Sequence, residues 1–189
     1  GDFRRVAVDA RQRVVDLPLQ GRDVAQLIAL SGAAVAHEGA GIKSNLNHPD
    51  AVAYSVAGGL ANATNYILDG GAHVDPRTNV GMPLPFPEAM EEFKVETSAL
   101  PANYGSQPGG AVNVVTKSGT NRITGTLFWF VRNYRLNARN FFDLEKNDTL
   151  KRNQFGGTIG GPIVKDKVFY FAAFQGTTLR QLPTPSRVY

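Results

Sequence analysis

Two predicted strands separated by a turn-rich loop form the most informative part of the chain. In the first strand, Phe93 and Val95 alternate with Lys94 and Glu96, and this period of two indicates one buried side and one solvent-facing side. The loop is rich in proline, glycine, asparagine and serine, which are typical turn residues. The second strand is β-branched and apolar, and a Lys-Ser-Gly-Thr turn ends it. The three segments are residues 91–96, 101–110 and 111–117.

Shorter elements are expected before this pair. Asp23 is a candidate N-cap for a helix whose apolar side carries Val24, Leu27 and Ile28, together with Ser31. A glycine at position 32 is expected to end that helix. A proline at the first helical position predicts one helical turn over 87–92. Strands are expected at 51–57 and 65–69, a short alternating run lies at 6–8, and loops are expected at 37–50 and 72–87.

The pattern changes after residue 119, where long aromatic strands are predicted. Strands are expected at 123–134, 153–163 and 168–175, with a polar, basic loop at 135–152 and a tight turn at 164–167. Alternation along the first of these strands separates two faces. One face carries Ile123, Gly125, Leu127, Trp129 and Val131, and the other carries Thr124, Thr126, Phe128, Phe130 and Arg132. The length and the first face suit a transmembrane β-strand, which needs about 9–11 residues. A soluble sandwich strand is the alternative.

Charge and composition exclude several classes of function. Residues 1–121 hold nine basic and twelve acidic side chains, and residues 122–189 hold eleven and four. The basic residues lie at strand ends and are not interleaved with aromatic residues that could stack on bases. No nucleic-acid partner is therefore expected. The chain has no cysteine, which rules out disulfides and thiolate chemistry. No apolar run reaches roughly 18 residues, so a membrane role would require β-strands.

No enzyme activity, metal or cofactor is expected. Glu91 and Glu92 are adjacent, so on a helix their carboxylates diverge. Asp69, His73 and Asp75 lie close together in sequence, but their spacing matches no ligand motif, and solvated loop residues are the better interpretation.

Nine fragments of the chain, in this order and spacing, resemble the TonB-dependent outer-membrane receptors. The resemblance is to the Oar-like branch, which has a carboxypeptidase-regulatory-like domain upstream, and it covers roughly residues 13–180. The fragments are LPLQGRD (17–23), NYILDG (65–70), PEAMEEFKV (87–95), NYG (103–105), GGAVNVVTKSG (109–119), GTLF (125–128), RNFFD (139–143), RNQFGG (152–157) and GGPIVKDKVFYF (160–171).

The resemblance implies an α+β fold class and three parts of the chain. Residues 1–121 are expected to form a small mixed plug domain with short helices. Residues 122–180 are expected to supply about three antiparallel strands equivalent to the start of a transmembrane barrel, and residues 181–189 an extended tail. The family's barrel has about 22 strands and is filled by the plug. Three strands cannot close a barrel, and the coupling box would lie upstream of this sequence, so the chain is not expected to transport by itself.

The implied parent function is uptake of a bulky nutrient across the outer membrane of a Gram-negative-type bacterium. The implied partners are the remainder of the barrel, a periplasmic energy-coupling protein, and outer-membrane lipid along residues 122–176. In this family plug loops face the substrate, so the expected ligand-facing residues are His37, Asn45, His48, His73, Asp75 and Arg77.

A second hypothesis is self-association. The segments 126–131 and 168–174 combine high β-propensity, low charge and no proline, and free strand edges of this kind pair with further copies. The chain would then form a homo-oligomer or filament, extracellular if released. The residues expected to carry this contact are Leu127, Trp129, Val131, Phe169, Phe171 and Phe174. An unrelated soluble β-rich binding protein is a third hypothesis, which predicts that these aromatic side chains are hidden.

Overall fold

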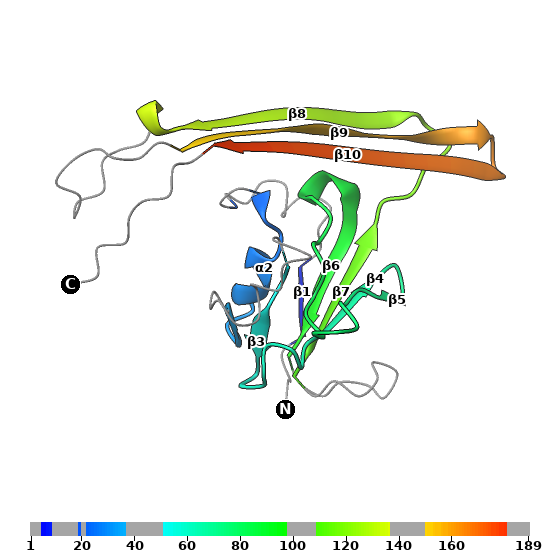
Figure 1. The fold of residues 1–189 in the computed structure, drawn as a ribbon. Helices are drawn as coiled ribbons and strands as arrows, with labels where there is room; N and C mark the ends of the chain where they lie inside the picture. The colour runs from blue at the N-terminus through cyan, green and yellow to red at the C-terminus, as the bar shows by residue number, and fades with distance from the viewer. Residues whose placement is uncertain are drawn as a thin grey trace. The chain divides into compact units, whose positions relative to one another are not determined.

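The computed structural model describes residues 5–8, 19, 22–36, 51–97, 109–136 and 150–180. The chain divides into two compact units, Gly1–Lys117 and Ser118–Tyr189 (Figure 1). Strands dominate both units, and each unit is built around its own sheets. Among the described residues, no helix is long and apolar enough to cross a membrane.

The first unit is built on a five-stranded mixed sheet with the order β1-β6-β7-β4-β5. Only β4 and β7 pair in parallel, and the other neighbours are antiparallel. A separate antiparallel pair joins β2 and β3. The strands are β1 (Arg5–Val8), β2 (Ala34–Ala36), β3 (Tyr54–Val56), β4 (Asn65–Leu68), β5 (Gly71–Ala72), β6 (Met90–Glu96) and β7 (Ala111–Thr116).

The hydrophobic core of this unit lies between the sheet and a single helical turn. Leu27 and Ile28 of α2 (Gln26–Ala29) are buried, as are Phe93 of β6 and Tyr66 of β4. These side chains belong to one continuous cluster of buried residues. The core therefore uses the apolar positions that the period-two and helical patterns predicted.

The helix expected after Asp23 is much shorter than its apolar pattern indicated. Arg22 has a φ of 57° and Gly32 a φ of 75°, so two left-handed positions bound the segment. The Asp23 carboxylate accepts a hydrogen bond from the Ala25 N–H at 2.9 Å, which turns the chain before α2 begins. The buried set is still the expected one, since Val24 and Ser31 are buried along with Leu27 and Ile28.

Two further expectations for this unit were wrong in detail. The turn at 87–92 is a 3₁₀ helix over Pro87–Ala89 (η2), and strand β6 begins at Met90, so Glu91 and Glu92 lie on a strand, at an irregularity of its register, rather than on a helix. Glu96 was expected on the solvent-facing side, but it is buried. Its carboxylate lies 2.7 Å from the Lys94 ammonium, which shares its side of the strand and offsets the cost of burying the charge.

The second unit is a three-stranded antiparallel sheet with the order β10-β9-β8 (Figure 1). Its strands are β8 (Thr124–Asn133), β9 (Lys151–Val164) and β10 (Val168–Arg180), and a 3₁₀ helix, η4 (Tyr134–Leu136), follows β8. The turn between β9 and β10 contains Asp166 in the left-handed region, at a φ of 63°.

Strand β10 is longer than the sequence pattern predicted. The strand was expected to stop at Gln175 and to be followed by an extended segment, but it continues to Arg180, whose Cα partner is Lys151 of β9. The β-branched Thr177 and Thr178 favour strand, and β9 supplies the ladder partners. Residues 181–189, expected as a tail, lie outside the described residues.

Candidate functional site

The sheet of the second unit has one predominantly apolar face. Residues directly opposite each other on antiparallel strands share a face, so the register groups the side chains into lateral rows. From the β9–β10 turn toward the other end, three rows make up the apolar face. These rows are Gly125–Ile159–Ala172, Leu127–Gly157–Phe174 and Trp129–Phe155–Gly176.

This apolar face is open to solvent in the structure. Leu127 is 93% exposed, Trp129 73% and Phe174 65%. Isolated exposed hydrophobic residues are normal on a protein surface, but a continuous apolar face across three strands indicates a membrane or a partner. The third hypothesis, a soluble binding protein with hidden aromatics, is not supported by these exposures.

The opposite face mixes polar and aromatic side chains. The Thr126 and Thr158 hydroxyls are hydrogen-bonded at 2.9 Å between β8 and β9. The rings of Phe128 and Phe130 follow on the same face of β8, with centroids 5.7 Å apart. From Gly125 to Val131, strand β8 therefore alternates between an apolar set and a mixed set of side chains, which is the pattern of transmembrane barrel strands.

Aromatic side chains lie at both ends of the apolar face. Trp129 and Phe155 form one cross-strand pair, and Tyr170 is paired with Gly161 near the β9–β10 turn. From Phe155 to Gly161 is six residues, or about 20 Å along an extended strand, which a strand tilt of about 40° reduces to roughly 15 Å along the membrane normal. This span is shorter than the apolar band of about 25 Å that barrels present to lipid between aromatic girdles, and the exposed Ile163 and Val164 continue the apolar part of β9 beyond Gly161.

Basic side chains gather beyond the Trp129 row. Lys151 is the Cα partner of both Asn133 and Arg180, so the three residues form the last row of the same face. Beside this row, the Tyr134 ring lies 5.8 Å from the Lys151 ammonium and 5.9 Å from the Arg135 guanidinium. A hydrogen bond to the Tyr134 hydroxyl raises the pKa of Arg135 above its usual value. The arrangement creates a cationic end with an aromatic centre.

At the other end of the sheet, hydrogen bonds join the β9–β10 turn to the segment that leads into β8. The Asn121 amide donates to Asp166 Oδ1 at 2.5 Å, and the Asp166 N–H donates to Asn121 Oδ1 at 2.9 Å. Gly119 packs so closely that an added Cβ would lie 2.2 Å from the Tyr170 carbonyl oxygen. These contacts fix where β8 begins relative to the β9–β10 turn.

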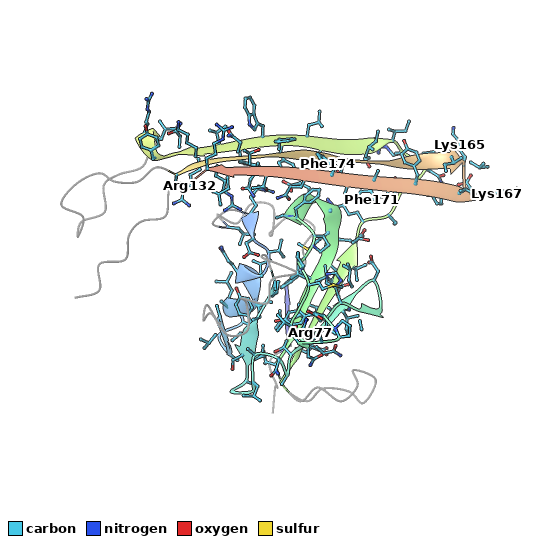
Figure 2. All side chains as sticks on the ribbon, viewed as in Figure 1. Arg77, Arg132, Lys165, Lys167, Phe171 and Phe174 are labelled. Atoms are coloured by element: carbon cyan, nitrogen blue, oxygen red, sulfur yellow. The ribbon has the colours of Figure 1, made fainter. Side chains whose placement is uncertain are left out.

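The six residues expected to carry self-association do not share one face. Leu127, Trp129 and Val131 lie on the apolar face of β8, and Phe174 lies beside them on β10. Phe169 and Phe171 are the Cα partners of Pro162 and Gly160, whose positions on β9 belong to the opposite face. Figure 2 shows the labelled Phe171 and Phe174 on the same strand.

His73, Asp75 and Arg77 lie in one compact turn-rich segment of the first unit. Asp75 accepts a hydrogen bond from the Arg77 N–H at 2.9 Å, and the Asp75 carbonyl accepts from the Asn79 N–H at 2.7 Å. A His73 ring nitrogen lies 3.0 Å from the Pro83 carbonyl oxygen. The side chains of His73 and Asp75 are therefore engaged with local backbone, as those of turn residues commonly are.

The other three ligand-facing candidates, His37, Asn45 and His48, lie outside the described residues. Within the part of the chain that the structure describes, no group of three or more His, Cys, Asp or Glu side chains is arranged to hold a metal ion.

Two sets of residues were missed by the sequence interpretation. Phe155 and Ile159 of β9 belong to the apolar face, and their odd-numbered spacing was a usable signal that the intervening glycines concealed. Lys151 and Arg180 are 29 positions apart in sequence, and only the register of β9 and β10 shows that they are neighbours.

Comparisons with known proteins agree with the architecture. The family model for an outer membrane beta barrel domain matches residues 115–188. The TonB-dependent transporter Oar of Myxococcus xanthus is 28% identical over 127 residues, which are 64% of this chain and 12% of that protein. The crystal structure of the siderophore receptor PirA from Acinetobacter baumannii matches 94% of this chain and 24% of that chain, with a TM-score of 0.64 and 18% identity.

The chain thus spans a small part of the length of both proteins. At its level of identity, the PirA match shows a shared fold, and the Oar match extends the similarity to sequence. One of these proteins is named a transporter and the other a receptor. The resemblance indicated by the sequence motifs is confirmed: by sequence and by fold, the chain is TonB-dependent-receptor-like.

Proposed function

We propose that the chain supplies the plug and the first three transmembrane strands of a TonB-dependent transporter in an outer membrane. Strands β8, β9 and β10 cross the bilayer, and the first unit is the plug. The observation that carries the proposal is the continuous apolar face of Leu127, Trp129, Phe155 and Phe174, exposed on one side of an antiparallel sheet.

The free energy of solvation favours lipid as the occupant of that face. A large apolar side chain gains about 1.5–3 kcal/mol when it leaves water for an apolar environment. Leu127, Trp129 and Phe174 alone provide three such side chains. A Lys or Arg at the bilayer midplane would cost about 2–4 kcal/mol, and the three rows of the apolar face carry neither.

The opposite face suits the interior of a barrel. Threonine and glutamine side chains there, including the hydrogen-bonded Thr126 and Thr158, remain satisfied in a polar lumen. The glycine-rich β9 also allows close packing of the neighbouring strands. A filled lumen would cover the phenylalanines of this face.

The first unit supports a role as the plug because it has a sheet and a hydrophobic core of its own. In this proposal it moves when a periplasmic energy-coupling protein binds the transporter, and it admits a bulky nutrient from outside. The segment that holds His73, Asp75 and Arg77, together with residues 37–50, contacts that nutrient. The names of the two similar proteins, a transporter and a siderophore receptor, support transport as the class of function.

A second candidate function is self-association through the sheet edges. Strands β8 and β10 are the two outer strands of the sheet that the structure describes. An edge strand exposes backbone N–H and C=O groups that pair readily with another chain. Size-exclusion chromatography with negative-stain microscopy separates the two candidates. Ordered filaments in buffer without detergent favour assembly, and a monomer under the same conditions excludes it.

Cysteine scanning tests the transporter proposal directly, because the chain has no native cysteine. Single cysteines at each position from 124 to 133 are labelled with a nitroxide in phosphatidylcholine vesicles. Contact with lipid-dissolved oxygen should peak at odd positions, such as 127 and 129, and contact with a water-soluble nickel chelate at even ones. Uniform accessibility along the segment would overturn the assignment of the apolar face to lipid.

A further inference from the structure

The apolar face of the three-stranded sheet ends in a cationic row. Going outward from Trp129, the next row is Val131–Asn153–Thr178, and the row after it is Asn133–Lys151–Arg180. The face thus changes from apolar to polar to cationic over four residues of β8. Lys151 and Arg180 are both exposed, and no ion pair between described residues involves either of them.

The depth of this row matches that of lipid headgroups, if β8–β10 cross the bilayer as proposed above. Four residues of strand span about 13 Å, and a strand tilt of about 40° reduces this to roughly 10 Å along the membrane normal. Trp and Tyr side chains mark the boundary of the hydrocarbon in membrane proteins. The backbone of this row, about 10 Å beyond Trp129, lies just outside a headgroup layer of about 5–8 Å. The long Lys and Arg side chains reach back from there into the headgroups.

Three more basic residues extend the positive charge at this end of the sheet. Arg132 and Arg152 are Cα partners on the opposite face, and Arg135 follows in η4. Tyr134 lies against both Arg135 and Lys151, so one aromatic ring positions two of the cations. The connection at 137–149 contains three acidic and two basic residues, so the balance of charge at this end stays positive.

The lengths of the two connections indicate which side of the membrane this end faces. Outer-membrane barrels have short periplasmic turns and longer extracellular loops. The β9–β10 turn occupies only residues 165–167, whereas thirteen residues separate η4 from Leu150. The cationic row therefore belongs to the extracellular side, next to the outer leaflet.

We propose that Lys151 and Arg180, with Arg135, bind the phosphate groups of phosphorylated lipids in the outer leaflet. Two exposed cations in register form a site for a phosphate oxygen pair, and clusters of Lys and Arg beside a membrane segment attract anionic headgroups. A lipid is the source of the phosphate, rather than a soluble anion, because the cations continue the apolar face that holds the acyl chains.

Binding to vesicles of two compositions tests this proposal. The chain is mixed with phosphatidylcholine vesicles, with or without phosphatidic acid, and the bound fraction is measured by flotation. The wild-type chain should bind the phosphatidic acid vesicles more tightly. The double substitution Lys151→Gln/Arg180→Gln should reduce the preference for phosphatidic acid vesicles about tenfold.

The matched control removes the same charge from the other end of the sheet. Figure 2 labels Lys165 and Lys167 at the turn, where Asp166 lies between them in sequence and reduces the local positive charge. The substitution Lys165→Gln/Lys167→Gln should lower the preference by less than about threefold. Equal losses in the two variants would mean diffuse electrostatic attraction and would overturn the proposed site, as would no loss in either.

Two further measurements are needed. The first identifies the source of the phosphate, and the second tests the membrane role on which the proposal rests. Inorganic phosphate should displace the chain no better than chloride at equal ionic strength, and selective displacement would indicate a free-phosphate site instead. Trp129 quenching by brominated lipid should be unchanged in Lys151→Gln/Arg180→Gln, because the apolar face is intact. Absence of quenching in the wild-type chain would contradict the membrane role itself, whereas loss of quenching only in the variant would contradict the headgroup site.

Discussion

Asn121 and Asp166 hold each other through a reciprocal pair of hydrogen bonds that joins the segment before β8 to the β9–β10 turn. Both residues are exposed, so water replaces part of what a substitution removes. Asn121→Ala should lower the free energy of unfolding of the second unit by about 1–2 kcal/mol, since two hydrogen bonds are lost. Urea unfolding of the chain in detergent measures the change.

The control for this substitution is Asp166→Gly, because Asp166 adopts a φ of 63° that glycine tolerates well. This variant keeps the turn and the bond from the backbone N–H of residue 166, so its loss should be smaller than that of Asn121→Ala. A larger loss for Asp166→Gly would contradict the dominant role of the Asn121 side chain.

Gly119 is predicted to be intolerant of any side chain. A Cβ there would lie 2.2 Å from the Tyr170 carbonyl oxygen and 2.9 Å from the Gly161 carbonyl oxygen, and neither backbone atom moves easily. Gly119→Ala should cost about 1–3 kcal/mol, the usual range for overpacking. Gly71→Ala is the control, because its nearest neighbour would be at an ordinary 3.6 Å. Similar urea midpoints for both variants would show that the close approach at Gly119 is wrong.

Tyr66 should make the first unit sensitive to alkali. Burial raises the pKa of Tyr66 well above its ordinary value, so the folded chain keeps a proton that the unfolded chain releases. Above about pH 10 the unfolded state binds fewer protons, and stability falls by up to about 1.4 kcal/mol per pH unit until the folded pKa is reached. Urea unfolding of wild type and Tyr66→Phe from neutral to alkaline pH tests this, and equal pH slopes would contradict it.

The strands were predictable from sequence because their patterns are local. Phe93 and Val95 alternate with polar neighbours, and both are buried in β6 as expected. The shared face of Leu127, Trp129 and Val131 also follows directly from a period of two. In both cases the side of a strand is fixed by sequence parity alone.

Other features depended on partners far away in sequence. Glu96 was assigned to the solvent side because it alternates with Val95, but its Cα partners are Arg5 of β1 and Ala111 of β7, and it is buried within the sheet. The end of β10 depends on its pairing with Lys151 to Phe155, which a propensity for strand does not reveal. The cationic row has the same origin, since Lys151 and Arg180 become neighbours only through register.

The single tryptophan of the chain, Trp129, lies on the apolar face of β8–β10, which is proposed to contact lipid. The direct measurement is Trp129 fluorescence in phosphatidylcholine vesicles with brominated or ordinary acyl chains. If Trp129 contacts lipid, its emission should be blue-shifted, quenched by brominated chains and unaffected by aqueous iodide. Emission at the wavelength of a solvated indole, quenched by iodide and unaffected by brominated lipid, would contradict it.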